Sequence, residues 1–432
     1  MRCSAVTHGE FIKCLIAIPA NALVHKGNVM TGASRQETGK NIVVFSDGTG
    51  QEGGAGSNSN VYKLFTMVED RTSKQVAFYD AGLGTNWQKW TGSISGAGIT
   101  KNILECYQFI SDQYQWGDRI FLFGFSRGAA TVRSLSGFIS RFGILPHSRP
   151  DLVKQAWAIY KQSDQANREK DATAFLQRNT TTWCNIDFVG VWDTVAALGL
   201  PNKGLSAVLN KIPGLAHRFH DLKLSKCVQH AYHAISIDED RRDFRPTPFQ
   251  TEENGVSTLG EVFVDPRDGD GSEQAGKQRQ QTARQVWFAG VHTDVGGGYP
   301  EKGLSDISLT WMIDRAMDEK VLEHPLRLFP YSNVEIVQDI EGVIHSERAT
   351  WDEKLMFAEG RRSWDADIGG NLVVHQSVLQ RKKGVHGHES TPYTPWILKG
   401  LSEDQYEVEP WDNQDRMYSI PVELGYRRDP VP

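Results

Sequence analysis

The sequence predicts an α/β protein built on a mostly parallel, doubly wound sheet with cap insertions. Short apolar runs alternate along the chain with stretches whose apolar residues recur at helical spacing, as in an open α/β sheet. Polar and glycine-rich residues follow these apolar runs at their C-terminal ends, which is the edge where such sheets bind ligands. The expected strands are 41–45, 75–79, 120–123, 185–192, 234–237 and 285–291.

The expected elements follow one another in a regular order. The strand 41–45 leads through a polar, glycine-rich loop into a helical stretch at 61–69, and the strand 75–79 precedes a helix at 99–114. The run 120–123 is continuously apolar, which is typical of a strand buried on both faces. A helix follows it, with one apolar stripe formed by Val132, Leu135, Phe138, Ile139 and Phe142. A polar helical segment at 152–178 then separates this helix from the last three strands.

Three parts of the chain are expected. Residues 1–39 form an N-terminal tail that is disordered or precedes the true start, 40–320 form the catalytic domain, and 321–432 form an extension packed on that domain. Within the domain, 201–224 mixes apolar and basic residues and could cap the site, while 266–284 is a charged, solvated loop.

Composition excludes several classes of protein. A net charge of −6 over 432 residues gives no support to nucleic-acid binding. The five cysteines are scattered and lack C-x-x-C spacing, so neither a disulfide framework nor a zinc site follows. No segment reaches the roughly 18 to 20 apolar residues that span a bilayer. The stretch 14–22 is similar to a signal peptide, but Pro19 interrupts it, so we expect no cleaved signal and a cytoplasmic location.

One serine stands at a strand-to-helix junction between two glycines. Gly124-Phe-Ser126-Arg-Gly128 matches G-x-S-x-G, the nucleophile elbow of the α/β-hydrolase fold. Such an elbow holds its serine on a tight, strained turn, and only glycine fits at the flanking positions. The apolar run before the motif and the amphipathic stretch after it are the context that the motif requires. We therefore predict an α/β-hydrolase-like fold with Ser126 as nucleophile.

A serine hydroxyl needs a base, and the base needs an acid that orients it. In α/β-hydrolases the order along the chain is Ser, then Asp or Glu, then His. His292 is the preferred base, because it directly follows the last expected strand in a glycine-rich stretch, and His233 is the alternative. Three carboxylates compete as the acid. Asp193 is preferred because it ends the strand expected beside the elbow strand, and the alternatives are Asp238 and Asp294.

An acyl-transfer site also needs two backbone N–H groups that bind the oxyanion. One is expected from Arg127, the residue after the nucleophile, and the other from a glycine-rich loop after an earlier strand. The loop that begins at Asp47 has this character, so the N–H of Gly48 or Thr49 is the expected second donor.

Several blocks of sequence together resemble one family, the catalytic domain of the type VI secretion phospholipase effectors. These blocks lie at 47–49, 124–128, 190–195, 233–239, 287–299 and 303–306, with weaker similarity at 375–378 and 393–395. The resemblance implies a serine esterase with Ser126 as nucleophile and Asp and His partners downstream. It makes glycerophospholipid ester hydrolysis the leading activity, and it adds secretion by a type VI system as an alternative to the cytoplasm.

The function predicted is therefore a serine-dependent carboxylic-ester hydrolase, most simply a phospholipase or lipid esterase, with no cofactor and no metal. Its partner would be a lipid or another ester, and peripheral contact with a membrane is left open. Two alternatives stay open. A metal-assisted hydrolase could use Asp47, Asp193, His292 and Asp294, all at expected strand ends. A non-catalytic binding protein with an α/β-hydrolase-like fold is the other alternative, because fold does not determine function.

Overall fold

The computed structural model describes most of the chain after residue 38. The described residues are 39–48, 53–54, 56–82, 96–195, 224–253, 256–263, 278–329, 334–350, 354, 357–364, 366, 370–383 and 392–412. The predicted N-terminal tail lies outside them except for its last residue, as does the predicted cap 201–224 except for Leu224. Of the predicted loop 266–284, residues 266–277 lie outside them.

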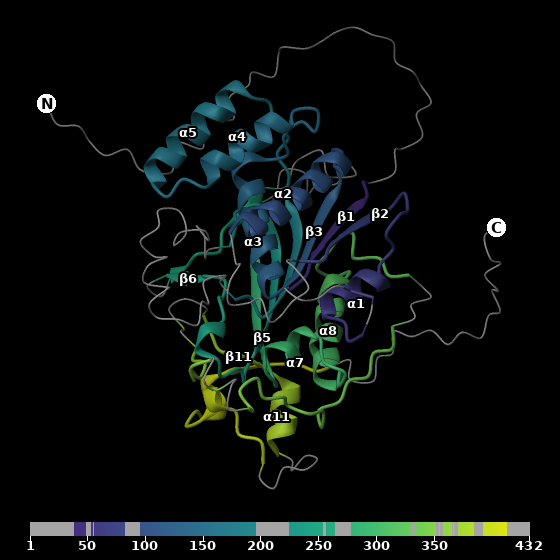
Figure 1. Ribbon diagram of the computed structural model, residues 1–432, viewed down its shortest axis with the longest axis vertical. Helices are drawn as coiled ribbons and strands as arrows, with labels where there is room; N and C mark the ends of the chain where they lie inside the picture. Colours follow the sequence, from purple (N-terminus) through teal and green to yellow (C-terminus); the bar gives the residue numbers. More distant parts are fainter. Residues whose placement is uncertain are drawn as a thin grey trace, which may run out of the picture. The chain divides into compact units, whose positions relative to one another are not determined.

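The centre of the fold is a sheet of eight strands in the order β12-β11-β10-β5-β4-β3-β1-β2, and every neighbouring pair is parallel. This confirms the predicted α/β class with its mostly parallel sheet. The strands are β1 (Asn41–Ser46), β2 (Gln75–Asp80), β3 (Arg119–Phe125), β4 (Ile186–Trp192), β5 (Val228–Ser236), β10 (Thr282–Phe288), β11 (Val373–His375) and β12 (Glu407–Glu409). Of these, β1, β2, β3, β5 and β11 are labelled in Figure 1.

The strand order reverses at β1. The chain runs outward from β1 to β2 and then returns to place β3 on the other side of β1. In doubly wound sheets, ligands bind outside the carboxyl ends of the strands at such a reversal. The residues that follow β1 and β3 therefore stand where this architecture places binding sites.

Helices cover both faces of the sheet. Ile42 and Val44 of β1 point into a core shared with α2, α3, α4 and α5, whereas Val43 and Phe45 point into a core shared with α1 and α8. This alternation explains why the buried strands read as continuous apolar runs. The helices of the described residues are α1 (Asn60–Met67), α2 (Gly96–Gln113), α3 (Arg127–Phe142), α4 (Pro150–Tyr160), α5 (Gln165–Arg178), α7 (His292–Gly296), α8 (Gly303–Ala316) and α11 (Gln376–Lys383).

The remaining short elements lie outside the main sheet. Two antiparallel ribbons pair β6 (Glu252–Glu253) with β7 (Val256–Ser257), and β8 (Glu261–Phe263) with β9 (Gln278–Gln280). Within the described ranges, the segments Arg242–Phe244, Trp396–Leu398 and Glu403–Gln405 form single-turn helices. The polar segment predicted at 152–178 forms two helices rather than one, because Asp164 caps α5 after a break.

Two predictions are wrong, one on the length of a strand and one on the edge of the sheet. The strand predicted at 234–237 begins at Val228, so His230 and His233 lie within β5 and not before it. Their polar side chains hid the strand, although β5 is paired on both sides, with β4 and with β10. The prediction also ended the sheet at 285–291, whereas β11 and β12, three residues each, continue it. Strands this short carry too few residues for a period-2 signal.

Candidate active site

Ser126 lies at the junction of β3 and α3 in a strained backbone conformation. Its φ is 56° and its ψ −116°, and its backbone N–H donates to the carbonyl of Trp192 at 3.0 Å. The turn leaves no room for side chains at the flanking glycines. A Cβ on Gly128 would lie 2.0 Å from the carbonyl oxygen of Ser46, and one on Gly124 would lie 2.6 Å from the carbonyl oxygen of Gly128. The need for glycine at both positions is therefore steric.

Asp193 and His292, which are 99 residues apart in the sequence, meet in the structure. Nδ1 of His292 lies 2.5 Å from Oδ2 of Asp193, and both side chains are buried. Because an ionised carboxylate can only accept, Nδ1 of His292 carries the proton and Nε2 is left as the basic nitrogen. His292 occupies the first position of α7, directly after the loop that follows β10.

The neighbours of Ser126 bring this pair to the end of β3. Phe125 pairs in register with Trp192, so Ser126 and Asp193 are the residues that follow two adjacent parallel strands. The Phe125 ring lies against the His292 imidazole, with ring centroids 4.6 Å apart and an angle of 32° between the ring planes. From the other side, a Cβ on Gly48 would lie 3.4 Å from Cβ of Ser126. Ser126 is therefore surrounded by the loop after β1 and by the dyad of Asp193 and His292.

Backbone strain is concentrated at two of these residues. Among the described residues, Ser126 and Asp193 are the only non-glycine residues with positive φ, at 56° and 38°. Such conformations cost on the order of 1–3 kcal/mol each and persist only where surrounding contacts hold them. Asp193 is held by its backbone N–H, which donates to the carbonyl of Ala234 at 2.7 Å.

Asp193 is also held by Arg362, which the sequence reasoning missed. The Arg362 guanidinium donates to both carboxylate oxygens, at 2.5 Å to Oδ1 and 2.8 Å to Oδ2. The backbone N–H of Ser236 donates to Oδ1 at 2.9 Å. Burial by itself raises the pKa of Asp193, but the charge of Arg362 and the hydrogen bonds from His292 and Arg362 outweigh it. The net effect holds the pKa well below its usual range, so Asp193 is a buried anion.

A second buried acid supports the backbone of the imidazole residue. Oε2 of Glu239 accepts from the backbone N–H of His292 at 3.2 Å. Glu239 is paired with Arg241, whose Nε and second terminal nitrogen each lie 2.8 Å from a carboxylate oxygen. The Arg241 guanidinium stacks on Phe244, and the Phe244 ring meets the His292 ring edge to face at 5.2 Å. Glu239 and Arg241 therefore hold the start of α7 in place.

The alternative acids have other partners. Oδ2 of Asp238 accepts from the hydroxyl of Tyr393 at 2.6 Å and from the backbone N–H of Gly290 at 2.7 Å. Burial raises the pKa of Asp238 to about 7. Asp294 accepts from His345 Nδ1 at 2.6 Å and from the backbone of Val291 at 3.0 Å. Both carboxylates therefore brace the segments that flank His292, and neither is bonded to its ring.

The alternative base is built into the sheet. His233 lies within β5, where Nε2 accepts from the backbone N–H of Thr194 at 3.1 Å and Nδ1 donates to Gln285 at 3.3 Å. Burial first, and then the charge of Arg133, lowers its pKa to about 3. The ring is neutral and both nitrogens are engaged, which favours a structural role.

The expected oxyanion donors are only partly described. The backbone N–H of Gly48 donates to Oδ1 of its neighbour Asp47 at 2.7 Å, while Thr49 lies outside the described residues. Asp47 also accepts from the hydroxyls of Ser59 and Tyr79, and burial raises its pKa to about 6. Asp47 therefore shapes the loop after β1, and the Gly48 N–H that was expected to bind the oxyanion is engaged with it. Arg127 begins α3 directly after Ser126.

The four residues suggested for a metal site are divided among different partners. Asp47 is bonded to Ser59 and Tyr79, Asp294 to His345, and only Asp193 and His292 contact each other. Over the described ranges, no three or more His, Cys, Asp or Glu residues are arranged to hold a metal ion.

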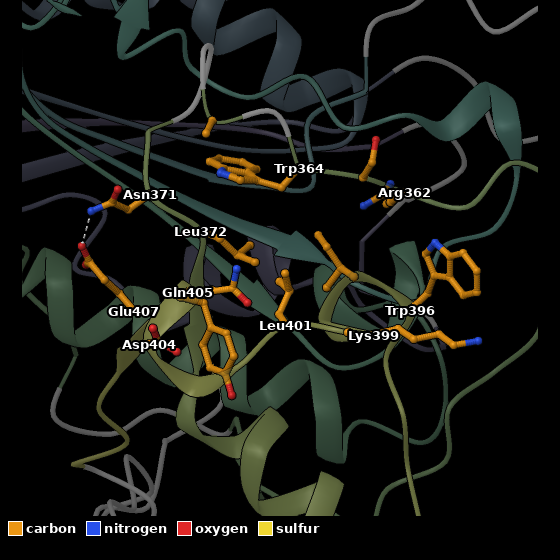
Figure 2. Close-up of a pocket in the computed structure, with 15 residues that line it drawn as sticks. Arg362, Trp364, Asn371, Leu372, Trp396, Lys399, Leu401, Asp404, Gln405 and Glu407 are labelled. Atoms are coloured by element: carbon orange, nitrogen blue, oxygen red, sulfur yellow. Dashed lines mark hydrogen bonds between the residues drawn. The ribbon is translucent and has the colours of Figure 1, made fainter. Parts of the chain in front are cut away.

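A separate pocket of about 910 Å³ lies at the C-terminal extension, next to Arg362 (Figure 2). Its lining residues all come from the segment 362–407, and Trp364, Leu372 and Leu401 are among the apolar ones. In Figure 2, Trp396 and Lys399 lie on the same side of the pocket as Arg362, and Glu407 lies on the opposite side. None of Ser126, Asp193 and His292 lines this pocket, so the pocket is distinct from the candidate active site at Ser126.

No helix in the described part of the chain is both long and apolar enough to cross a bilayer.

Comparison with known proteins identifies the family. An uncharacterized protein of Saccharomyces cerevisiae is 28% identical over 242 residues, which are 50% of this chain and 34% of that protein. An uncharacterized protein from Pseudomonas aeruginosa of known crystal structure has a TM-score of 0.37 and 17% identity, over 67% of this chain and 47% of that chain. The Tle1 effector bound to the VgrG spike of the type 6 secretion system has a TM-score of 0.35 and 16% identity, over 65% and 56%. The chain thus spans about a third of the curated relative and about half of each solved structure.

The family model for the catalytic domain of type VI secretion phospholipase effectors of the Tle1-like type matches residues 40–315, which is more than half of the chain. This confirms the resemblance drawn from the sequence blocks. The chain belongs to the Tle1-like phospholipase effector family.

Proposed function

We propose that the protein is a serine hydrolase of carboxylic esters with a catalytic triad of Ser126, His292 and Asp193. The observation that carries the proposal is the 2.5 Å contact between His292 and Asp193 beside a strained serine at the end of β3. This is the constellation of nucleophile, base and orienting acid that ester hydrolysis uses.

The proposed reaction has two steps. Ser126 Oγ attacks the ester carbonyl carbon while Nε2 of His292 takes the hydroxyl proton, and the collapsing intermediate releases the alcohol, which receives that proton. Water, deprotonated by the same nitrogen, then attacks the acyl-enzyme, releases the carboxylic acid and restores the Ser126 hydroxyl. Asp193, ionised and fixed, holds Nδ1 protonated and stabilises the imidazolium that forms in both steps.

The oxyanion of each tetrahedral intermediate needs two backbone donors. We assign one to the N–H of Arg127, which begins α3 and thus adds the positive end of the helix dipole. Since the Gly48 N–H is engaged by Asp47, we assign the second to Thr49 rather than to Gly48.

The substrate class rests on the family. Phospholipase is the activity named for the matched model, so a glycerophospholipid acyl ester is the proposed substrate. The same description extends the proposal to delivery by a type VI secretion system.

The test uses Ser126→Ala. The matched control is Ser134→Ala, which replaces another serine in α3, the helix that follows the motif. We expect Ser126→Ala to lose hydrolysis of a short-chain nitrophenyl ester and labelling by a fluorophosphonate, with an unchanged circular dichroism spectrum, while Ser134→Ala keeps both activities. Phospholipid vesicles should yield free fatty acid and lysophospholipid. Full activity of Ser126→Ala would refute the nucleophile, and release of a phosphorylated headgroup without fatty acid would refute the ester class.

A further inference from the structure

Arg362 comes from the C-terminal extension, beyond the region that the family model matches. Its side chain is only 1% exposed. Its two terminal nitrogens donate to groups on and around the acid of the proposed triad. The acceptors are both oxygens of Asp193, the carbonyl and hydroxyl of Ser236 at 2.7 and 2.6 Å, and the carbonyl of Phe244 at 2.5 Å. The extension therefore places a full positive charge behind the acid.

The geometry of the pair is a two-point one. One terminal nitrogen of Arg362 meets Oδ1 of Asp193 and the other meets Oδ2, so rotation of the carboxylate would break one of the two bonds. Oδ2 of Asp193 is also the atom that accepts from His292. The guanidinium thus determines the plane in which Asp193 presents that oxygen to the imidazole.

The charge balance of the buried site also depends on Arg362. Asp193 is 0% exposed, and burying an unpaired carboxylate strongly favours its protonated form. A protonated Asp193 would no longer require the proton on Nδ1 of His292 and would not stabilise the imidazolium. A neutral hydrogen-bond donor at position 362 could preserve the packing but could not replace the charge.

We propose that Arg362 is a positioning residue of the active site, which keeps Asp193 ionised and oriented toward His292, so that the C-terminal extension completes the triad. The proposal rests on the proposed function, since it assigns Arg362 a role only through Asp193 and His292. In this role Arg362 differs from a buried arginine that only links segments of the chain. Loss of such an arginine would affect stability without affecting the pH dependence of nucleophile activation.

The sign of the pH effect follows from the charges. Without Arg362, the negative charge of Asp193 is no longer balanced. The unbalanced charge favours uptake of a proton by the dyad of His292 and Asp193, and the loss of Arg362 also favours the protonated form of Asp193 itself. Both changes make the site bind a proton more tightly. The acid limb of the activity profile should therefore move to higher pH. Among the described residues, Glu239 and Arg241 also lie close to the dyad, where they pair with each other and remain in place. His233 interacts with Asp193 as well, but burial lowers its pKa to about 3, so it stays neutral in all the variants.

The experiment measures the rate of fluorophosphonate labelling against pH, because this reports activation of the serine without knowledge of the substrate. The variants are Arg362→Gln, Arg362→Lys and the control Arg361→Gln. The control replaces the preceding arginine, Arg361, which is about half exposed and stacks on Trp396. For Arg362→Gln we expect the acid limb to rise by about one pH unit or more, with labelling near pH 6 slowed by about tenfold or more. Arg362→Lys should lie between Arg362→Gln and the wild type, and Arg361→Gln should match the wild type.

A double-variant cycle separates positioning from structure. In an Asp193→Asn background, where the acid is already neutral, Arg362→Gln should slow labelling by less than about threefold. An acid limb that stays in place in both Arg362→Gln and Arg362→Lys, or an equally large loss in the Asp193→Asn background, would overturn the proposal. If Arg362→Gln does not fold, as judged by thermal unfolding, Arg362→Lys decides by a smaller shift of the acid limb in the same direction. Failure of the proposed function itself is recognised separately, because the wild type would then not be labelled at Ser126.

Discussion

Ser126 and Asp193 follow adjacent parallel strands, β3 and β4, and both leave the strand with a positive φ, of 56° and 38°. The two turns are coupled, because the N–H of Ser126 donates to the carbonyl of Trp192, the residue before Asp193. Each turn lifts a polar side chain over the carboxyl end of the sheet, where His292 meets Asp193. Strain of this kind is kept where it serves a function, and its release is measurable.

We first predict that relieving the strain at position 126 stabilises the protein while abolishing activity. Ser126→Gly should be about 1 kcal/mol more stable than Ser126→Ala in urea unfolding, because glycine adopts positive φ without the steric penalty that alanine retains. Both variants should fail to react with a fluorophosphonate. Equal stability of the two variants would show that the backbone at Ser126 is not strained.

A second prediction concerns the choice between the two acids. Asp193→Asn should lower kcat/KM for a nitrophenyl ester by about 10³–10⁴-fold, because an amide permits the wrong tautomer of His292. Asp238→Asn should lower it by less than about tenfold, because Asp238 contacts Tyr393 and Gly290 and not the imidazole. The opposite ranking of the two variants would assign the acid to Asp238.

The steric fit of the elbow leads to a third prediction. Gly128→Ala should destabilise the protein by more than about 2 kcal/mol and remove activity, since the new Cβ would lie 2.0 Å from the carbonyl oxygen of Ser46 and the backbone would have to move. Gly260→Ala is the matched control, because its nearest neighbour would be 3.6 Å away, in ordinary contact. Thermal unfolding and esterase activity of the two variants provide the measurement, and similar results for both would contradict the steric argument.

A fourth prediction concerns the pH dependence of stability at Asp238. Its pKa is raised to about 7 by burial, above the value of about 3.9 in the unfolded chain. Between these two values the unfolded state has lost the proton and the folded state keeps it, so the contribution of Asp238 to stability is present below pH 4 and is lost as the pH rises through 7.

Asp238→Asn removes this titration. Its free energy of unfolding, relative to wild type, should therefore rise between pH 4 and 7 by on the order of 4 kcal/mol and stay level above pH 7. Replacing the exposed Asp412 by Asn should show no such trend in the same urea titrations. A constant difference between Asp238→Asn and wild type across this range would mean that Asp238 titrates normally.

Local patterns were enough to predict most of the fold. Apolar runs such as Ile120–Phe123 and the glycines on either side of Ser126 carry their information within a few residues, so the class, the parallel sheet and the strand-to-helix junction were accessible. The strand β5 was predicted too short because His230 and His233 interrupt its apolar pattern, and only pairing on both sides makes it a strand. The strands β11 and β12 were missed because three residues contain no readable period.

Within the candidate site, sequence reasoning reached the residues at strand ends and no further. It preferred Asp193 and His292 from their positions after buried strands, and the structure brings these two together. It expected the N–H of Gly48 or Thr49 to bind the oxyanion, and in the structure the Gly48 N–H donates to Asp47. Arg362 lies in a polar stretch with no motif, and nothing in its spacing relates it to Asp193, which is 169 residues away.

By itself, then, the sequence determined that an α/β sheet presents a serine between two glycines, because periodicity and steric demand are properties of neighbouring residues. Only the tertiary structure decided which carboxylate faces the imidazole of His292, and that a guanidinium from the C-terminal extension stands behind it. Those pairings depend on how strands and loops distant in the sequence meet at one sheet edge. The energies that select them, burial of a charge and its neutralisation, exist only once the chain has folded.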